Sequence, residues 1–79
     1  MKARITVTLK SGVLDPQGKA IMSALSALGF SGVGDVRQGK VFDIEIDETD
    51  RAIAGDRLGA MCDKLLANTV IENYQIELV

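Results

Sequence analysis

The chain has 79 residues, 47% of them hydrophobic, with a formal net charge of −2 and an isoelectric point near 4.9. This length predicts one domain over residues 1–79, and the acidic balance argues against nucleic-acid binding, which needs a concentrated basic surface. Histidine is absent and Cys62 is the single cysteine, so the usual general base, an internal disulfide and a zinc ligand set are all missing. Catalysis by this chain alone is not expected.

Size also bears on assembly and location. A domain this small buries only about 60–65% of the surface that its unfolded chain exposes. Without a disulfide or metal, self-association is the expected further source of stability. No signal-peptide pattern follows Met1 and no apolar run is long enough to cross a membrane, so we expect a soluble, cytoplasmic protein.

The first predicted element is a strand over residues 3–9. Apolar and polar residues alternate strictly in it, which is typical of a strand with one buried face. The buried face would carry Ala3, Ile5, Val7 and Leu9, and the outer face Arg4, Thr6, Thr8 and Lys10.

The loop over residues 10–18 is the most constrained connection in the chain. Gly12 can adopt a positive φ, and Asp15, followed by proline, indicates the capped start of a helix. Val13 and Leu14 are apolar where loops are usually polar, so they must be buried in this subunit or in a neighbouring one. Phosphate binding is disfavoured, because the glycine spacings of the known motifs are absent and the carboxylate would repel an anion.

A helix is predicted from Pro16 to Leu28. Gly29 is expected to end it in the left-handed conformation, with Phe30 folding back onto Leu25. Apolar residues at three- and four-residue spacing form one stripe along it, namely Ala20, Ile21, Ala24, Leu25 and Leu28.

Two strands are predicted next, a short one over residues 35–38 and a longer one over 41–47. Gly39 and Lys40 between them indicate a hairpin. The acids Asp43, Glu45 and Asp47 alternate along the longer strand at a spacing of roughly 7 Å, which is too wide to converge on one metal ion. A solvated or cross-strand-paired acidic face is therefore preferred to a metal site.

A second helix is predicted from residue 49 or 50 to Ala67, followed by a last strand around Tyr74. The acids before this helix would supply its cap. Cys62 lies on the apolar stripe without an activating partner, so we interpret it as a packed side chain and not as a nucleophile. The stripe consists of Ala54, Leu58, Met61, Cys62 and Leu65.

The predicted order β-α-β-β-α-β indicates an α+β fold, a two-layer sandwich resembling the ferredoxin-like arrangement. In that arrangement the first strand lies between the third and the fourth. Arg4 and Lys10 would then neighbour the acids Asp43, Glu45 and Glu77 on the uncovered face of the sheet, which suits docking onto another subunit.

Several stretches resemble the PurS family, the small subunit of phosphoribosylformylglycinamidine synthase. The most specific is the loop over residues 10–18, Lys-Ser-Gly-Val-Leu-Asp-Pro-Gln-Gly. The resemblance continues through residues 28–30, 36–40, 61–68 and 70–74, so it covers nearly the whole chain. Thr69 departs from the proline, and Asn73 from the acid, that are common in the family.

The resemblance implies a dimeric or tetrameric, non-catalytic subunit. It would bridge a glutaminase subunit and a large synthetase subunit and help ammonia pass between them, while the whole complex uses ATP, Mg²⁺ and glutamine to convert formylglycinamide ribonucleotide to its amidine. Apolar anchors beside basic side chains make a plausible docking surface. The candidate interface residues are Lys10, Gly12, Val13, Leu14, Asp15, Pro16, Gly18, Arg37, Gly39 and Lys40; no catalytic, cofactor-binding or metal-binding residue is predicted.

Two other functions share the predicted element order. A regulatory module similar to the amino-acid-binding ACT domains is the first alternative, and ligand binding by the isolated chain would favour it. A small enzyme of acylphosphatase-like architecture is the second, but its phosphate loop and its arginine–asparagine pair are not found in the sequence.

Overall fold

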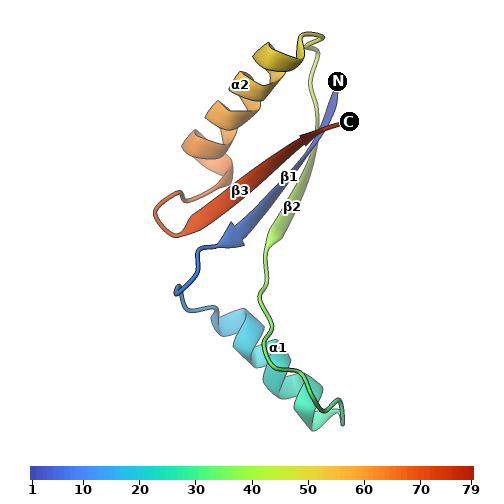
Figure 1. Ribbon diagram of the computed structural model, residues 1–79, viewed down its shortest axis with the longest axis vertical. Coiled ribbons are helices and arrows are strands. Elements are labelled where there is room, and N and C mark those ends of the chain that lie inside the picture. Colours follow the sequence, from blue (N-terminus) through green and yellow to red (C-terminus); the bar gives the residue numbers. More distant parts are fainter.

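The computed structural model describes residues 1–79. It contains three strands and two α-helices, the second of which continues into a π-helical turn (Figure 1). None of its helices has the length and apolar character that crossing a lipid bilayer requires. In chain order the elements are β1 (Lys2–Leu9), α1 (Pro16–Ala27), β2 (Lys40–Glu45), α2 (Arg51–Met61), the turn η1 (Cys62–Leu66) and β3 (Glu72–Leu78).

The strands form one antiparallel sheet in the order β2-β1-β3. The predicted α+β class and the central place of the first strand are therefore confirmed. Arg4 lies opposite Asp43 on β2 and Glu77 on β3. Lys2, and not Lys10, lies opposite Glu45, because the antiparallel register places Glu45 beside the start of β1, whereas Lys10 lies beyond the other end of this strand.

The core lies between the sheet and α2. As predicted, an acid caps this helix: Asp50 Oδ1 accepts from the backbone N–H groups of Ala52 at 2.9 Å and Ile53 at 3.1 Å. At the other end the hydroxyl of Tyr74 on β3 donates to Asp63 Oδ1 in η1 at 3.0 Å, which joins the two layers. The fully buried core side chains are Ile5, Val7, Ala54, Leu58 and Cys62.

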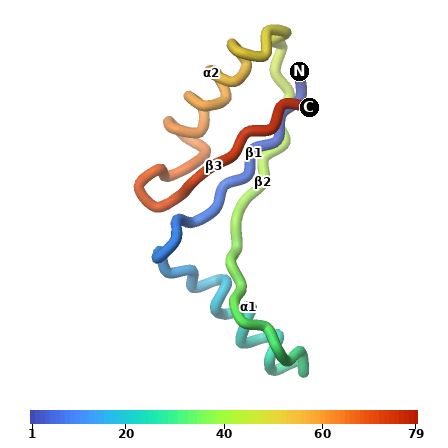
Figure 2. The backbone as a smooth tube through the Cα atoms, viewed as in Figure 1, coloured from blue at the N-terminus to red at the C-terminus, as the bar shows by residue number.

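The helix α1 does not join this core. With its flanking loops it forms an arm, residues 10–39, that projects beyond one end of the sheet (Figures 1 and 2). The molecule measures 49 × 24 × 15 Å, with a radius of gyration of 16.0 Å. A compact chain of this length would have a radius of gyration of about 12 Å. The apolar stripe predicted for this helix is consequently almost uncovered, and only Leu25 in it is half-buried.

The ends of α1 follow the sequence signals. Asp15 is its N-cap, and Pro16 occupies its first turn. At the other end Gly29 has a φ of +94°, and the backbone N–H of Phe30 donates to Leu25 O at 3.0 Å. The chain therefore reverses where the glycine predicts, although the phenyl ring remains mostly exposed.

Residues 35–38, predicted to be a strand, pair with no other strand in this chain. Gly39 and Lys40 do not form the predicted hairpin, because the chain runs on from the arm into β2 without reversing (Figure 2). The three glycines with positive φ are Gly12, Gly29 and Gly32, so Gly39 supplies no left-handed turn. It lies instead against β1, where an added Cβ would be 2.5 Å from Val7 O. Within one chain, α2 alone covers the sheet.

Candidate functional site

The loop over residues 10–18 forms the base of the arm, directly after β1. Gly12 has the predicted positive φ, +86°, and the Val13 backbone N–H donates to Lys10 O at 3.1 Å to close the turn. Val13 is half-buried, whereas Leu14 is 65% exposed. The ordered turn is therefore confirmed, and its second apolar residue is left on the surface.

Asp15 fastens this loop to the returning chain. Asp15 is only 4% exposed, and its carboxylate accepts two backbone hydrogen bonds, from Gln38 N at 2.7 Å and from Gly18 N at 2.8 Å. These donors, Gln38 before Gly18, hold the pKa of Asp15 below its usual value despite burial, and the nearby Arg37 charge acts in the same direction. Asp15 thus caps α1 and also joins the start of this helix to Gln38, which lies 23 residues further along the chain.

Gly18 explains why the first turn of α1 contains a glycine. A Cβ built at this position would lie 2.2 Å from Val36 O and 2.8 Å from Asp15 Oδ2. Only a residue without a side chain lets the returning segment lie against the helix here. Gly18 is therefore part of the arm's internal packing, and its backbone N–H donates a hydrogen bond to Asp15 Oδ1.

The side chain of Arg37 stabilises the same loop by hydrogen-bonding to its backbone carbonyls. Its Nη1 donates to Val13 O at 2.8 Å and its Nη2 donates to Lys10 O at 3.2 Å. The planar guanidinium donates to both carbonyls through a rigid fork of N–H groups, which a lysine ammonium group does not have. Arg37 and Lys40, the two basic residues on either side of Gly39, therefore have different partners. Arg37 contacts the loop, whereas Lys40 Nζ lies 3.7 Å from Glu72 Oε2 on β3.

Leu14 marks the surface that these contacts leave free. It borders a hollow between the base of the arm and the sheet, together with Leu9, Pro16, Gly39 and Lys40. Of the predicted interface residues, the structure therefore brings Leu14, Pro16, Gly39 and Lys40 to one side of the arm. Gly12, Val13 and Arg37 line the neighbouring hollow, and Leu14 and Asp15 border both hollows.

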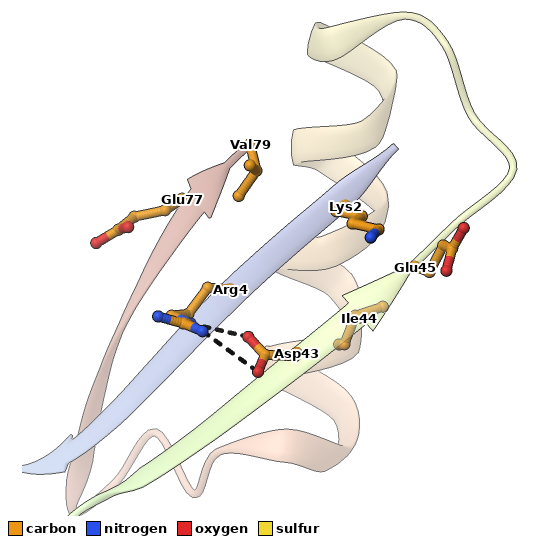
Figure 3. Close-up of a pocket in the computed structure, with 7 residues that line it drawn as sticks. All are labelled: Lys2, Arg4, Asp43, Ile44, Glu45, Glu77 and Val79. Carbon is orange, nitrogen blue, oxygen red and sulfur yellow. Dashed lines mark hydrogen bonds and ion pairs between the residues drawn. The ribbon is translucent and has the colours of Figure 1, made fainter.

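The uncovered face of the sheet holds a third hollow, shown in Figure 3. Its centre is the ion pair between Arg4 and Asp43, whose Nε and Oδ1 atoms lie 2.8 Å apart. The guanidinium, as hydrogen-bond donor and as charge, lowers the pKa of Asp43. Both side chains are more than half exposed, so salt screens their attraction and its contribution is small.

Three further acids of residues 43–50, namely Asp47, Glu48 and Asp50, have partners within the chain. Asp47 and Glu48 both lie within 4 Å of Arg57, at 3.5 and 3.9 Å, and Asp50 caps α2. Cys62 is fully buried, and burial, with Asp63 adding to it, raises the pKa of its thiol. A buried thiol whose pKa is raised is a poor nucleophile at neutral pH.

Two features of this site were missed at the sequence level. The Gln38 N–H and the Val36 carbonyl take part through the backbone, and side-chain patterns carry no signal for such contacts. The exposure of Leu28, at 73%, and of Phe30, at 60%, was also missed, because periodicity identifies an apolar stripe without showing what covers it.

Comparison with known proteins gives consistent results. Residues 2–79 match the PurS family model, described as phosphoribosylformylglycinamidine (FGAM) synthase. The PurS subunit from Synechocystis is 52% identical over 75 residues, which cover 95% of this chain and 75% of that one. The Bacillus subtilis subunit is 46% identical over 76 residues, which cover 96% and 89%.

Solved structures agree over the arm as well as the sheet. B. subtilis PurS superposes with a TM-score of 0.87 at 46% identity, covering 96% of this chain and 94% of that one. A chain in the structure of PurLQS from Thermotoga maritima superposes with a TM-score of 0.89 at 29% identity, covering 99% and 95%. Scores this high over nearly the whole chain mean that the arm projects from the sheet in those chains too.

Proposed function

Since the chain belongs to the PurS family, we propose that it is the small subunit of phosphoribosylformylglycinamidine synthase in purine biosynthesis. In this role it bridges a glutaminase subunit and a large synthetase subunit. The complex converts formylglycinamide ribonucleotide to formylglycinamidine ribonucleotide, using ATP and glutamine. The chain contributes position and assembly, and no catalytic residue, to that reaction in the cytoplasm.

The exposure of Leu14 is the observation that carries this proposal. An apolar side chain stands 65% exposed on a loop whose carboxylate, arginine and glycine are all committed to holding it in place. A rigid loop that presents an apolar anchor beside Lys40 and Pro16 has the composition of a protein–protein contact. Ordering such a loop in advance lowers the entropy that binding must overcome.

The chemistry is divided accordingly. The glutaminase releases ammonia, and the synthetase activates the substrate amide with ATP and Mg²⁺. The small subunit, as a dimer or larger oligomer, holds the two so that ammonia passes between them. The hydrogen bonds of Asp15 and Arg37 hold the loop over residues 10–18 in place for this bridging role, so these side chains have a structural and not a chemical part in it.

Co-purification with the glutaminase and the synthetase, with and without glutamine and ADP, tests the proposal. We expect Leu14→Ser to weaken the complex without changing the melting temperature of the isolated chain. Glutamine-dependent amidine formation should fall, and high ammonia should partly restore it. Val79→Ser is the matched control, because Val79 is 80% exposed at the opposite end of the sheet.

Two outcomes count against this role. A wild-type chain that fails to co-purify with either subunit overturns the proposal. A Leu14→Ser chain that melts several degrees lower yet binds normally shows that Leu14 closes the subunit's own core. Arg37→Glu is not used as a docking variant, because its loss releases the loop itself.

A further inference from the structure

The turn between η1 and β3, residues 68–72, holds apolar side chains in solvent. Val70 is 81% exposed and Ile71 is 38% exposed, and neither belongs to the core between α2 and the sheet. Turns favour glycine, proline, asparagine, aspartate and serine, each for a backbone reason that valine does not share. The geometry of the turn therefore does not account for Val70.

Asn68 orders this turn through four hydrogen bonds. Its carbonyl accepts from the backbone N–H groups of Ile71 at 3.0 Å and Glu72 at 2.7 Å. Its side-chain Oδ1 accepts from the Val70 backbone N–H at 3.2 Å, and its own N–H donates to Glu72 Oε1 at 2.6 Å. Val70 is thus presented on an ordered turn before any partner binds, as Leu14 is on its loop, which lowers the entropy cost of binding.

The turn lies beside the loop that carries Leu14. The Lys10 backbone N–H, at the start of that loop, donates to Ile71 O at 2.8 Å. Glu72, at the end of the turn, lines the same hollow as Leu14. Figure 1 shows the loop and the turn at the end of the sheet from which the arm projects. The exposed apolar residues of both segments therefore belong to one end of the molecule.

The accessible charge at this end is positive, although the chain as a whole has a net charge of −2. Lys10 has no ion-pair partner within the chain, and the Lys40 side chain is more than half exposed. The nearby acids are covered, because Asp15 is buried and the Glu72 side chain is nearly so. A partner surface with exposed carboxylates complements this arrangement.

We infer that the 68–72 turn and the Leu14 loop form one docking surface, with Val70 as a second apolar anchor, for a partner subunit that offers apolar pockets rimmed by aspartate and glutamate. The inference rests on the proposed function and deepens it, because it adds the turn to the docking surface and names the chemistry of the partner. Apolar anchors supply most of the affinity of such a contact, whereas the charges steer the approach and fix its register.

A second copy of the chain does not match this surface. A two-fold contact brings identical patches together, so the ammonium groups of Lys10 and Lys40 would meet those of the other copy. Like charges placed together oppose association. Glu72 does not compensate for them, because one of its oxygens accepts from Asn68 N and the other lies beside Lys40 of the same chain. The expected occupant is therefore a different protein with acidic residues at its surface.

Removing the apolar anchor tests the surface. Val70→Ser should weaken binding to the purified glutaminase and synthetase, with glutamine and ADP present, by roughly ten-fold. The melting temperature and the sedimenting mass of the isolated chain should not change, because Val70 lies outside the core. Val79→Ser is the matched control, since Val79 is equally exposed at the opposite end of the sheet, and it should bind as the wild type does.

Two results of this experiment contradict the inference. Val70→Ser that binds the large subunits as tightly as the wild type removes the turn from the docking surface. A sedimenting mass that falls in Val70→Ser shows that the turn is a contact between copies of this chain.

The charge of the partner is tested by association kinetics, which do not depend on Val70. The wild-type association rate should fall as salt is added, because salt screens the attraction between lysines and carboxylates. Lys10→Gln should associate more slowly and with a weaker salt dependence, while its dissociation rate changes little. Lys2→Gln, at the other end of β1, is the control and should follow the wild type. A wild-type association rate that is independent of salt, or that rises with it, overturns the acidic partner.

These outcomes are separable from those of the proposed function. A wild-type chain that captures neither large subunit overturns the bridging role. Normal capture by the wild type, together with equally tight capture by Val70→Ser, overturns the extended docking surface alone.

Discussion

Asp15 Oδ2 accepts a hydrogen bond from the backbone N–H of Gln38 at 2.7 Å, and this contact joins the start of α1 to the end of the returning segment. With the two donations from Arg37, it makes the arm a braced unit at its base. The arm can therefore be placed on a partner without first being ordered, which favours binding.

The Asp15 contacts give a pH dependence with a definite sign. The folded-state pKa of Asp15 is lowered, so its contribution to stability is present above the unfolded value of about 3.9 and is lost as the pH falls through the folded value. We expect the urea concentration at which half of the wild-type chain is unfolded to decrease as the pH falls below about 4. In Asp15→Asn this midpoint should be lower at pH 7 and should change less with pH.

The control for this titration is Asp35→Asn, since Asp35 is exposed and bonds only to the next backbone N–H. Its curve should follow the wild type at every pH. Asp43 also titrates below its usual value and remains in both variants, so it does not affect the comparison. If the wild-type and Asp15→Asn profiles were the same, Asp15 would not be a source of the pH-dependent stability.

Two glycine-to-alanine changes should have opposite signs. Gly55→Ala in α2 meets nothing within 4 Å, so the helix should gain up to about 1 kcal/mol. Gly18→Ala brings a methyl group to 2.2 Å from Val36 O, and the returning segment must move. Thermal melts of the two variants check this, and a stabilised Gly18→Ala chain would show that the close approach at position 18 is not maintained.

Arg37→Ala should loosen the loop while sparing the sheet. Without the guanidinium, Val13 O loses the Arg37 donor and Lys10 O keeps only the Val13 backbone N–H. Hydrogen exchange should rise over residues 10–15 and stay unchanged in β1 and β3. Arg37→Lys should rescue little, because one ammonium group does not reproduce the two-carbonyl fork. Lys40→Ala is the matched change, and equal exchange in both variants would argue against a specific brace.

Cys62→Ala should fold with a loss of about 1 kcal/mol, the cost of removing one small buried group. Because burial raises the pKa of this thiol, the native wild-type chain should react with a thiol reagent only at its unfolding rate. The reconstituted synthase should keep its turnover. An assembled complex with greatly reduced turnover would reopen a chemical role for the sulfur.

The elements that sequence analysis predicted well are those whose partners are local or alternate along a strand. The Asp15 and Asp50 caps, the turns at Gly12 and Gly29 and the pairing of Arg4 with Asp43 all follow from residue type and spacing. The position of α1 beyond the end of the sheet could not be predicted in this way, because an apolar stripe does not identify the surface that covers it. The role of Arg37 was likewise hidden, since its partners are backbone carbonyls.

The hydrogen bond between Tyr74 and Asp63 gives the chain an intrinsic optical signal. Tyr74 is the only tyrosine and there is no tryptophan, so ultraviolet absorbance has a single phenol as its main source. Because Asp63 accepts its hydrogen bond, and desolvation adds to the effect, the pKa of Tyr74 lies above the usual 10.0. An alkaline titration followed through tyrosinate absorbance therefore reports whether η1 remains packed against β3. Any variant of the arm can be screened for damage to the rest of the molecule without adding a label.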